Sequence, residues 1–318
     1  MTVITLLEPS SRSQAKIAPA RGFNCFSFET WIGGQWVQVL DAVPDFESGH
    51  GKPSGSGIPL LFPFPNRIRG GSFDWQGTCY QLPLNDRFGH AIHGFCHDRP
   101  WRVLTEGPQS ARAEFQLSVD APERLPWWPC DFILEVDYEL LPHRLRANFR
   151  IINPSPDREL PWGLGTHPYF RLPPTPSSAQ EHCTVEVPAH EYWVLEQCLP
   201  TGQKKPVDPS RDLREGARCH TLQLDDVLTT LECIGPQVEM TLTDERGGIQ
   251  IVQACSPIFR EIVVFTPPAR SAICLEPYTC VTDAIHLQQQ GIDAGWRVLP
   301  PGGEFRTWID IWVTPVLV

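Results

Sequence analysis

A proline occurs about once in every ten residues of this chain, 33 in 318. Because proline lacks a backbone donor and its ring clashes with the preceding helical turn, this spacing leaves little room for long helices. Proline and glycine together still fall below the roughly 25–30% that is typical of low-complexity chains. Hydrophobic residues make up 41% of the sequence. The composition therefore excludes both an all-helical bundle and a disordered chain.

Apolar and polar residues alternate along many segments, which is the pattern of half-buried β-strands. Ala113, Phe115, Leu117 and Val119 share one face of such a segment. Two further alternating runs, residues 132–140 and 145–151, form a predicted hairpin around Leu141-Pro142-His143. Similar strands are expected at NCFSFE, QWVQVL, WRVLTE, CTVEV, YWVLEQC, VEMTLT, IQIVQA, EIVVF, AICLE and EFRTWIDIWV. More than a dozen consecutive strands predict an all-β fold, a large antiparallel β-sandwich with a few short helices.

Two segments are the best candidates for those short helices, Ser210 to Arg218 and Val281 to Gln290. Gly291 follows the second segment, as expected of a helix-ending glycine. No linker-like stretch divides the sequence, so one domain over residues 1–318 is expected.

The formal charge is −11, so no long-range field attracts a phosphate backbone or an anionic lipid surface. Neither nucleic acid nor a membrane is an expected partner. The first residues lack the basic start and apolar run of a signal peptide, so none is expected, and no stretch approaches the roughly 18 apolar residues of a membrane helix. Eleven cysteines are scattered without a CxxC pair, which favours reduced thiols over a zinc site or a disulfide framework. These features predict a cytoplasmic protein.

Two segments combine turn-forming residues with groups that bind oxygen-rich ligands. In FPFPNRIRGGSF, Asn66 and Arg67 could present an amide and a guanidinium fork together, although a surface arginine after a turn would have the same pattern. In HAIHGFCHDRPW, the spacing of His90, His93 and His97 would suit a metal only on a helix, which the glycines and proline disfavour. His93, before a glycine, is interpreted as a ligand contact, and the other two histidines are interpreted as surface residues.

Two further segments hold candidate acid and base groups. In WGLGTHPYF, His167 precedes a proline and two aromatic residues, a setting that suits a sugar because aromatic faces stack on pyranose rings. A buried structural histidine remains the alternative. In AICLEPYT, Glu276 ends an apolar strand, where a carboxylate is costly to bury unless it is paired or functional. Desolvation would raise the pKa of Glu276 and suit it to act as a general base, unless strand alternation turns it to solvent.

Taken together and in this order, these motifs resemble those of the aldose 1-epimerase family, also called galactose mutarotases. The resemblance rests on PFPNRI, IHGF, GLGTHPYF, LDDVLTTL, CLEPYT and LPPGGEFRTWIDIWV, which span about Asn66 to Val313. The opening segment IAPARGFNCFSFETWIGGQWVQVL is similar to the first strands of the family. The resemblance implies the galactose mutarotase-like supersandwich, in agreement with the strand count.

The resemblance also implies a reaction, the interconversion of α and β anomers of a free aldose such as glucose or galactose. In this family Glu276 would take the proton of the C1 hydroxyl, and His167, as an imidazolium, would protonate the ring oxygen. Ring opening, rotation and reclosure would return both groups to their starting state, with no cofactor, metal or covalent intermediate.

The resemblance implies that five further residues form the substrate-binding surface. Arg67 and His93 would bind sugar oxygens near the reacting carbon, with support from Asn66 and Tyr169. Asp225 matches the substrate-binding aspartate, although the adjacent Asp226 leaves this alignment open by one residue.

Two other functions on the same fold stay open. A hexose-6-phosphate 1-epimerase is the first, since Arg69, Arg87, Arg99 or Arg270 could contact a phosphate, although Cys96 and His97 stand where such enzymes tend to carry an arginine. A non-catalytic carbohydrate-binding or sugar-sensing protein is the second. The expected partner is a small-molecule sugar, and the chain could be a monomer or a homodimer.

Overall fold

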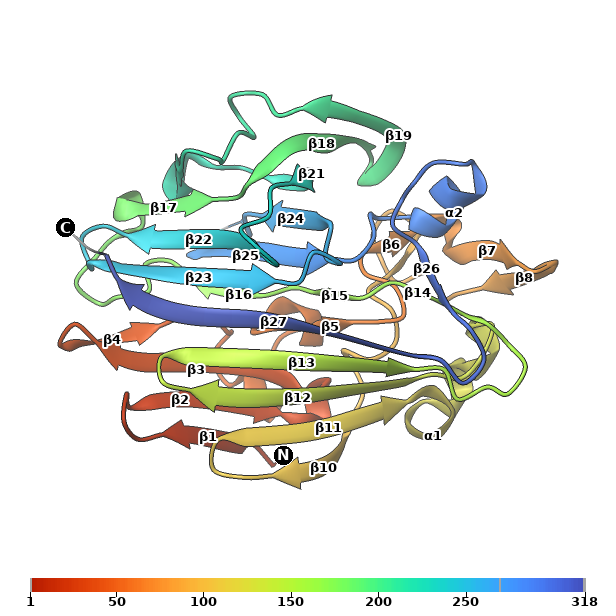
Figure 1. Ribbon diagram of the computed structural model, residues 1–318, viewed down its shortest axis with the longest axis horizontal. Helices are drawn as coiled ribbons and strands as arrows, with labels where there is room; N and C mark the ends of the chain where they lie inside the picture. Colours follow the sequence, from red (N-terminus) through yellow and green to blue (C-terminus); the bar gives the residue numbers. More distant parts are fainter. Residues whose placement is uncertain (1, 269, 317–318) are drawn as a thin grey trace.

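A computed structural model describes residues 2–268 and 270–316 of the chain. Its longest sheet has nine antiparallel strands, which cross the face of the molecule that is seen in Figure 1. In spatial order these strands are β10 (Arg102–Glu106), β11 (Ser110–Gln116), β12 (Ile133–Leu141), β13 (Arg144–Ile152), β27 (Glu304–Pro315), β23 (Ile249–Cys255), β22 (Val238–Asp244), β17 (Cys183–Glu186) and β20 (Ala217–Arg218).

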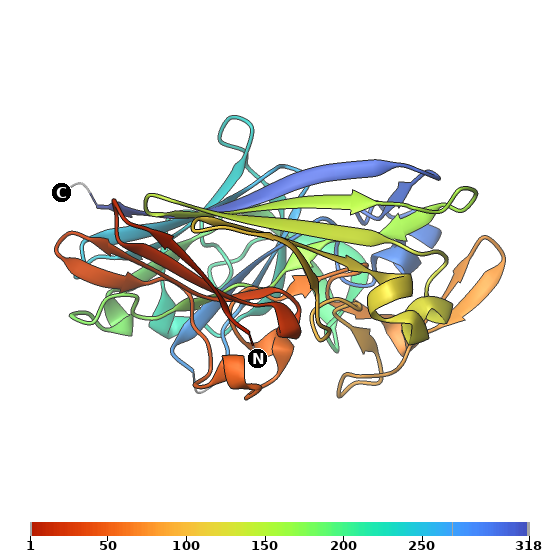
Figure 2. The ribbon, with the colours of Figure 1, turned by 90° about the horizontal axis from the view of Figure 1, so that it is seen from below.

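A second large sheet packs behind the first. Its strands are β19 (Leu199–Pro206), β18 (Ala189–Glu196), β21 (Asp225–Leu231), β24 (Glu261–Phe265), β25 (Ala272–Tyr278), β15 (Gly165–Thr166) and β5 (Leu60–Leu61), and β16 (Tyr169–Arg171) pairs with β25 off this path. The first four strands of the chain form a smaller sheet, β1 (Ile4–Glu8), β2 (Ser13–Ala18), β3 (Asn24–Ile32) and β4 (Gln35–Gln38). The view from below shows the long strands β12, β13 and β27 as one layer along one side of the molecule (Figure 2). The predicted antiparallel β-sandwich is confirmed.

Three short two-stranded ribbons complete the sheets, β6 (Arg67–Ile68) with β9 (Ala91–Ile92), β7 (Ser72–Trp75) with β8 (Thr78–Gln81), and β14 (Leu160–Trp162) with β26 (Arg297–Leu299). The α-helices are α1 (Leu117–Asp120) and α2 (Ala284–Gln289). Single 3₁₀ turns lie at Pro19–Arg21, Phe46–Ser48, Pro53–Gly55, Arg69–Gly71, Gln180–His182 and Cys219–Thr221, and a longer one at Pro122–Trp127. No helix among the described residues is long and apolar enough to cross a membrane.

Strand alternation divides the second sheet into two faces with different roles. On β25, Ile273 and Leu275 point into the main core between the two large sheets. Cys274, Glu276 and Tyr278 point to the opposite face, because successive side chains of a strand alternate. That face is also apolar: Val263 of β24 and Tyr278 pack there with residues of α2. A carboxylate on this face is therefore buried without lying in the sandwich core.

The hairpin predicted around Leu141-Pro142-His143 is confirmed, since Leu141 pairs with Arg144 and the strands stay in register to Ile133 and Ile152. His143 has a φ of 57°, a value that this tight turn imposes on its last residue. The helix predicted at 281–290 is confirmed in its central part as α2, and Gly291 has a φ of 78°.

The helix predicted at Ser210 to Arg218 is wrong. This segment forms turns followed by β20, and its charged side chains fold back on the local backbone and on neighbouring carboxylates. The guanidinium of Arg214 binds Asp212, and the Asp212 carboxylate also accepts the backbone N–H of Arg214. Such local side-chain bonds compete with a helical ladder.

The strand predicted to continue through Leu117 and Val119 is also wrong at its end. β11 stops at Gln116, and α1 follows. Asp131 accepts hydrogen bonds from the backbone N–H and the hydroxyl of Ser118, which turns the chain and leaves Val119 exposed.

Candidate active site

Glu276 lies near the end of β25 on the face that points away from the sandwich core. Only 2% of its surface is exposed. The register places Val263 of β24 beside Glu276, and Cys274 of β25 beside Phe265 of β24. Strand pairing therefore surrounds the carboxylate with apolar neighbours, as its place in the sequence AICLEPYT predicts.

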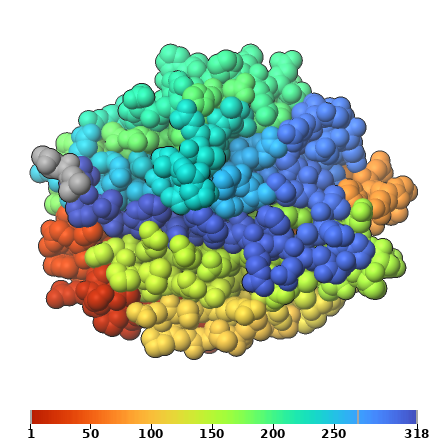
Figure 3. Space-filling model, in the orientation of Figure 1, coloured from red at the N-terminus to blue at the C-terminus, as the bar shows by residue number. Residues whose placement is uncertain are grey.

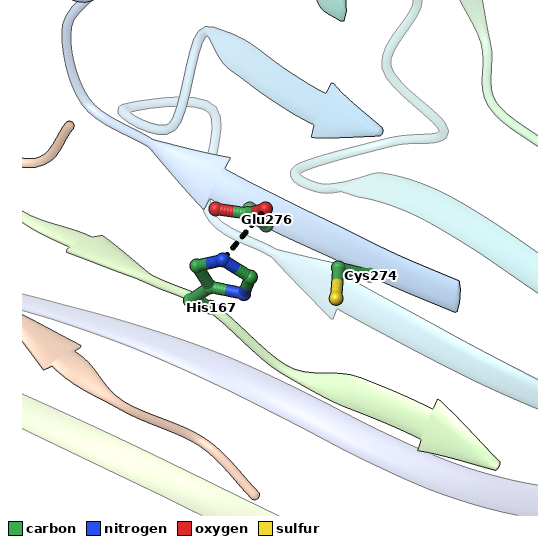
Figure 4. Close-up of side chains that lie close together, drawn as sticks. All are labelled: His167, Cys274 and Glu276. Carbon is green, nitrogen blue, oxygen red and sulfur yellow. Dashed lines mark ion pairs between the residues drawn. The ribbon is translucent and has the colours of Figure 1, made fainter. Parts of the chain in front are cut away.

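His167 lies between β15 and β16, next to β25. Its backbone N–H donates to the carbonyl of Pro59 at 3.1 Å, and its ring stacks on Tyr169 with centroids 4.7 Å apart and planes 5° apart. The imidazole Nε2 lies 3.2 Å from Oε1 of Glu276, as Figure 4 shows. Two residues 109 positions apart in the sequence are thus brought into contact by the pairing of β16 and β15 with β25.

The electrostatics of this pair favour neutral groups. Burial raises the pKa of Glu276 well above its ordinary value, and the hydrogen bond from Tyr278 only partly opposes this. Burial also lowers the pKa of His167 to about 3, with a smaller contribution from the positive charge of Arg270. Burial therefore disfavours the charged form of both groups, and a pair that holds one proton is more stable with that proton on the carboxyl group than on the imidazole. Proton transfer across the 3.2 Å contact converts it to imidazolium and carboxylate.

Tyr278 fixes the orientation of the Glu276 carboxyl group. Its hydroxyl donates a hydrogen bond to Oε2, which leaves Oε1 directed at His167. Burial raises the pKa of Tyr278 well above its ordinary value, so the phenol keeps its proton. Tyr278 is fully buried, and its ring packs so closely on Gly165 that a Cβ there would meet Cδ1 at 2.4 Å. The two oxygens of Glu276 thus have different neighbours before any ligand binds.

Asn66, Arg67 and His93 lie together at one end of the β6–β9 ribbon, where Asn66 precedes β6 and His93 follows β9. The backbone N–H of His93 donates to the carbonyl of Asn66 at 2.8 Å, and both residues have positive φ, 54° for Asn66 and 69° for His93. The Asn66 amide oxygen accepts from Arg67 at 2.9 Å. The His93 ring lies 5.8 Å from the ring of His167 between centroids. All three residues therefore lie on the side of the site where His167 lies.

His93 is a neutral imidazole. Burial lowers its pKa well below the ordinary value, and the nearby His167, His97 and Arg67 act in the same direction. Among the described residues, none offers a hydrogen-bond partner to Nδ1 of His93 or to Nδ1 of His167. An unpaired buried nitrogen is costly, so these two atoms are suited to a ligand's hydroxyl groups.

Asp86 holds Arg67 in place. It was not predicted from the sequence, yet its carboxylate accepts from Arg67 Nε at 2.6 Å, and its other oxygen accepts the backbone N–H of Phe88 and of His90. Burial acts to raise the pKa of Asp86, but these hydrogen bonds, chiefly the one from Arg67, lower it overall. The ion pair orients the guanidinium and neutralises its charge.

Strand register distinguishes Asp225 from Asp226. Asp225 pairs with Phe265, which pairs with Cys274, so Asp225 shares the face of β25 that carries Glu276. Asp226 points to the other face, where its carboxylate accepts from Arg211 at 2.8 Å. The structure thus places Asp225, and not Asp226, on the side of the candidate site, at its exposed rim.

The other two histidines of the triplet lie outside this group. His90 is buried and accepts the backbone N–H of Gly70 at 3.2 Å, so its interpretation as a surface residue is wrong. His97 is partly buried and bonds through Nδ1 to the carbonyl of His93. Both support the turn that presents His93.

A groove of about 550 Å³ lies away from this site, on the outer face of the nine-stranded sheet. Figure 3 shows this face, where the strands appear as successive bands of colour. Arg112, Glu135 and Arg150 line the groove. They are already paired with one another across the strands, Arg150 with Glu135 at 3.2 Å. The groove thus carries a cross-strand ion ladder, whereas the buried groups able to exchange protons converge at Glu276.

Comparison with known proteins gives a consistent result. The family model described as aldose 1-epimerase matches residues 31–312. The "Uncharacterized protein YihR" of Escherichia coli is 25% identical over 258 residues, which cover 80% of this chain and 78% of that protein. A galactose mutarotase-like protein from Clostridium acetobutylicum superposes with a TM-score of 0.85 at 20% identity, over 99% of both chains. The GalM/aldose epimerase homologue from C. elegans gives a TM-score of 0.81 at 18% identity, again over 99% of both chains.

Proposed function

Because the chain belongs to the aldose 1-epimerase family, we propose that it interconverts the α and β anomers of a free aldose by acid–base ring opening. The contact between His167 Nε2 and Glu276 Oε1, 3.2 Å long, carries this proposal. In an aldopyranose the C1 hydroxyl and the ring oxygen are bonded to the same carbon. The group that removes one proton and the group that delivers the other must therefore lie side by side.

The reaction begins when the single proton of the pair lies on His167. Glu276, as the carboxylate, accepts the proton of the C1 hydroxyl, while His167 donates its proton to the ring oxygen. The C1–O5 bond breaks as the C1 carbonyl forms, which gives the open-chain aldehyde. Rotation about the C1–C2 bond presents the other carbonyl face, and the reverse transfers close the ring. Each group returns to its starting state, so one proton on the pair suffices for every turnover.

Aromatic rings and polar groups around the pair suit a sugar ring. The ring of Phe265 lies edge-on to His167 with centroids 6.2 Å apart, and Tyr169 stacks on the imidazole. The partly exposed ring of Phe265 suits the C–H surface of a pyranose, whereas His167 and Arg270 already pack on the ring of Tyr169. The proposed hydroxyl partners are Arg67, supported by Asn66, together with His93 and Asp225.

The ion pairs of the nearby arginines favour a neutral sugar over a phosphorylated one. Three of the four arginines considered for a phosphate already bind carboxylates: Arg69 binds Asp283, Arg99 binds Glu123 and Arg270 binds Asp41. A phosphate dianion would have to compete with these partners. The remaining arginine, Arg87, is exposed and lies over the ring of Phe88.

Polarimetry tests the proposal. Freshly dissolved α-D-glucose and α-D-galactose relax slowly to their anomeric equilibrium, and the protein is expected to accelerate at least one of them far more than it accelerates glucose 6-phosphate. Heat-denatured protein at the same concentration is the control for buffer catalysis. If no free aldose relaxes faster than with the denatured sample, the proposed function is wrong.

A further inference from the structure

Cys274 lies beside the His167–Glu276 pair, and the proposed proton transfers do not use it. It precedes Glu276 by two residues on β25, so both side chains point to the same face of the sheet. All three residues are at most 7% exposed. Their donor atoms lie within 4.8 Å of one another, and Figure 4 shows His167 approaching β25 on the side of Cys274 and Glu276.

This set of donors, one nitrogen, one sulfur and one oxygen, is the set that Zn²⁺ accepts in tetrahedral protein sites. We propose that His167, Cys274 and Glu276 form a binding site for Zn²⁺, and that the bound ion inhibits anomer interconversion. The inhibition rests on the proposed function of the pair, whereas the binding does not.

The spacing of the donors fits the ion. With Zn–N and Zn–O bonds of about 2.0–2.2 Å, a tetrahedral site places nitrogen and oxygen about 3.3–3.5 Å apart. His167 Nε2 and Glu276 Oε1 are 3.2 Å apart before any metal binds. A Zn–S bond of about 2.3 Å places sulfur about 3.6 Å from the nitrogen. One donor atom from each residue lies within 4.8 Å of the other two, so rotations of the thiol and the imidazole would have to shorten the distance between sulfur and that nitrogen by at most about 1.2 Å.

The charges of the filled site also balance. On binding, the thiol and the carboxyl group release their protons to solvent, and the two resulting negative charges match the two positive charges of the ion. A buried site with no net charge avoids the penalty of an uncompensated ion. Three protein ligands leave the fourth position for water, as in other zinc sites with an open position.

Inhibition follows from the same geometry. The ion would use the imidazole lone pair that must receive a proton and the carboxylate oxygen that must accept one. Sugar and ion therefore compete for the same groups. Removal of the ion by a chelator restores the pair.

Equilibrium dialysis with Zn²⁺ alone tests the binding without any sugar. At low Zn²⁺ concentration we expect Cys274→Ala to bind one ion fewer per chain than the wild type. If the ion still binds, its affinity should fall by at least roughly 10–100-fold, because the loss of a residue that only supports a ligand already costs that much. Cys255→Ala, which removes a buried thiol from β23 in the other sheet, is the matched control and should bind like the wild type. The exposed thiols of Cys79 and Cys233 are common to all three proteins and cancel in the comparison.

Two further measurements complete the test. Thermal unfolding of Cys274→Ala and of Cys274→Ser checks that both variants fold, and the serine variant should show the same loss of zinc binding. Polarimetry with increasing Zn²⁺, with each rate expressed relative to that protein's own zinc-free rate, should show EDTA-reversible inhibition of the wild type and much weaker inhibition of Cys274→Ala. Equal zinc binding by the wild type and folded Cys274 variants would overturn the site. Binding without inhibition of an active wild type would overturn the inhibitory role.

Discussion

The hydroxyl of Tyr278 offers a sharp test of the acid–base pair, because Tyr278→Phe removes one hydrogen bond and keeps the ring. That hydroxyl donates to Oε2 of Glu276, and both residues are at most 2% exposed. The phenylalanine ring would keep its packing on Gly165. The substitution thus weakens the carboxylate form of Glu276 without opening the site.

The expected loss follows from the strength of that bond. A buried hydrogen bond to a charged group contributes about 1.5–3 kcal/mol, which corresponds to roughly a 10–150-fold loss of kcat/KM. Since Tyr278 acts to lower the pKa of Glu276, which burial raises, its removal raises that pKa further. The active one-proton form is lost as pH rises through this pKa. The alkaline limb of the pH–rate profile should therefore move to higher pH while the plateau falls.

The assay is polarimetry over a range of pH with the aldose that the wild type converts fastest. Tyr138→Phe is the control, because Tyr138 is a buried tyrosine of β12 in the other sheet, and its rate should match the wild type. A Tyr278→Phe plateau within about twofold of the wild type, with an unmoved alkaline limb, would refute the role of Tyr278 and the assignment of Glu276 as the base.

Three other substitutions test separate parts of the account. Asp225→Asn should raise KM roughly tenfold or more, as expected for a lost hydrogen bond to a charged group, whereas Asp226→Asn should not; equal KM values would show that Asp225 does not contact the sugar. Burial raises the pKa of Glu261 to about 7, so the stability that its protonated form contributes is complete below the ordinary pKa of 4.5 and is lost as pH rises through 7. In urea unfolding, the unfolding free energy of the wild type should fall by about 2–3 kcal/mol between pH 5 and 8 for this reason, and that of Glu261→Gln should not. Identical pH dependence in the two proteins would contradict the burial of Glu261. Gly165→Ala should lower the unfolding free energy by about 1–3 kcal/mol, because its Cβ would lie 2.4 Å from Tyr278 and 2.6 Å from Pro65; unchanged thermal stability would contradict this packing.

The strands were predictable because a period of two in apolar residues is a local signal. β12, β13 and their hairpin illustrate this, since both strands alternate and a Pro-His turn joins them. Asp212 and Arg214 show the limit: the predicted helix there depended on propensity alone, and short-range hydrogen bonds outweighed it. The alternation of apolar residues indicates a strand but does not show which strand it pairs with. Alternation therefore could not predict that β15 and β16 pair with β25 to form the site.

The candidate site shows the same division. Its motifs identified His167 and Glu276, but the charge state of the pair depends on burial from several strands and could not be read from the sequence. Cys274 and Tyr278 were missed, although both lie two residues from Glu276 and thus on its face of β25. The choice between Asp225 and Asp226 needed the register of β21 with β24.

The most direct test of the account is the rate of anomer interconversion by Glu276→Gln and His167→Asn, each compared with the wild type and with Glu261→Gln. Glu261 is a fully buried carboxyl group on the same face of the second sheet, so its substitution controls for the loss of any buried carboxylate. We expect both pair variants to remain folded and to lose catalysed mutarotation, while Glu261→Gln stays active. Wild-type rates in both pair variants would contradict the central claim that His167 and Glu276 exchange the protons of the reaction.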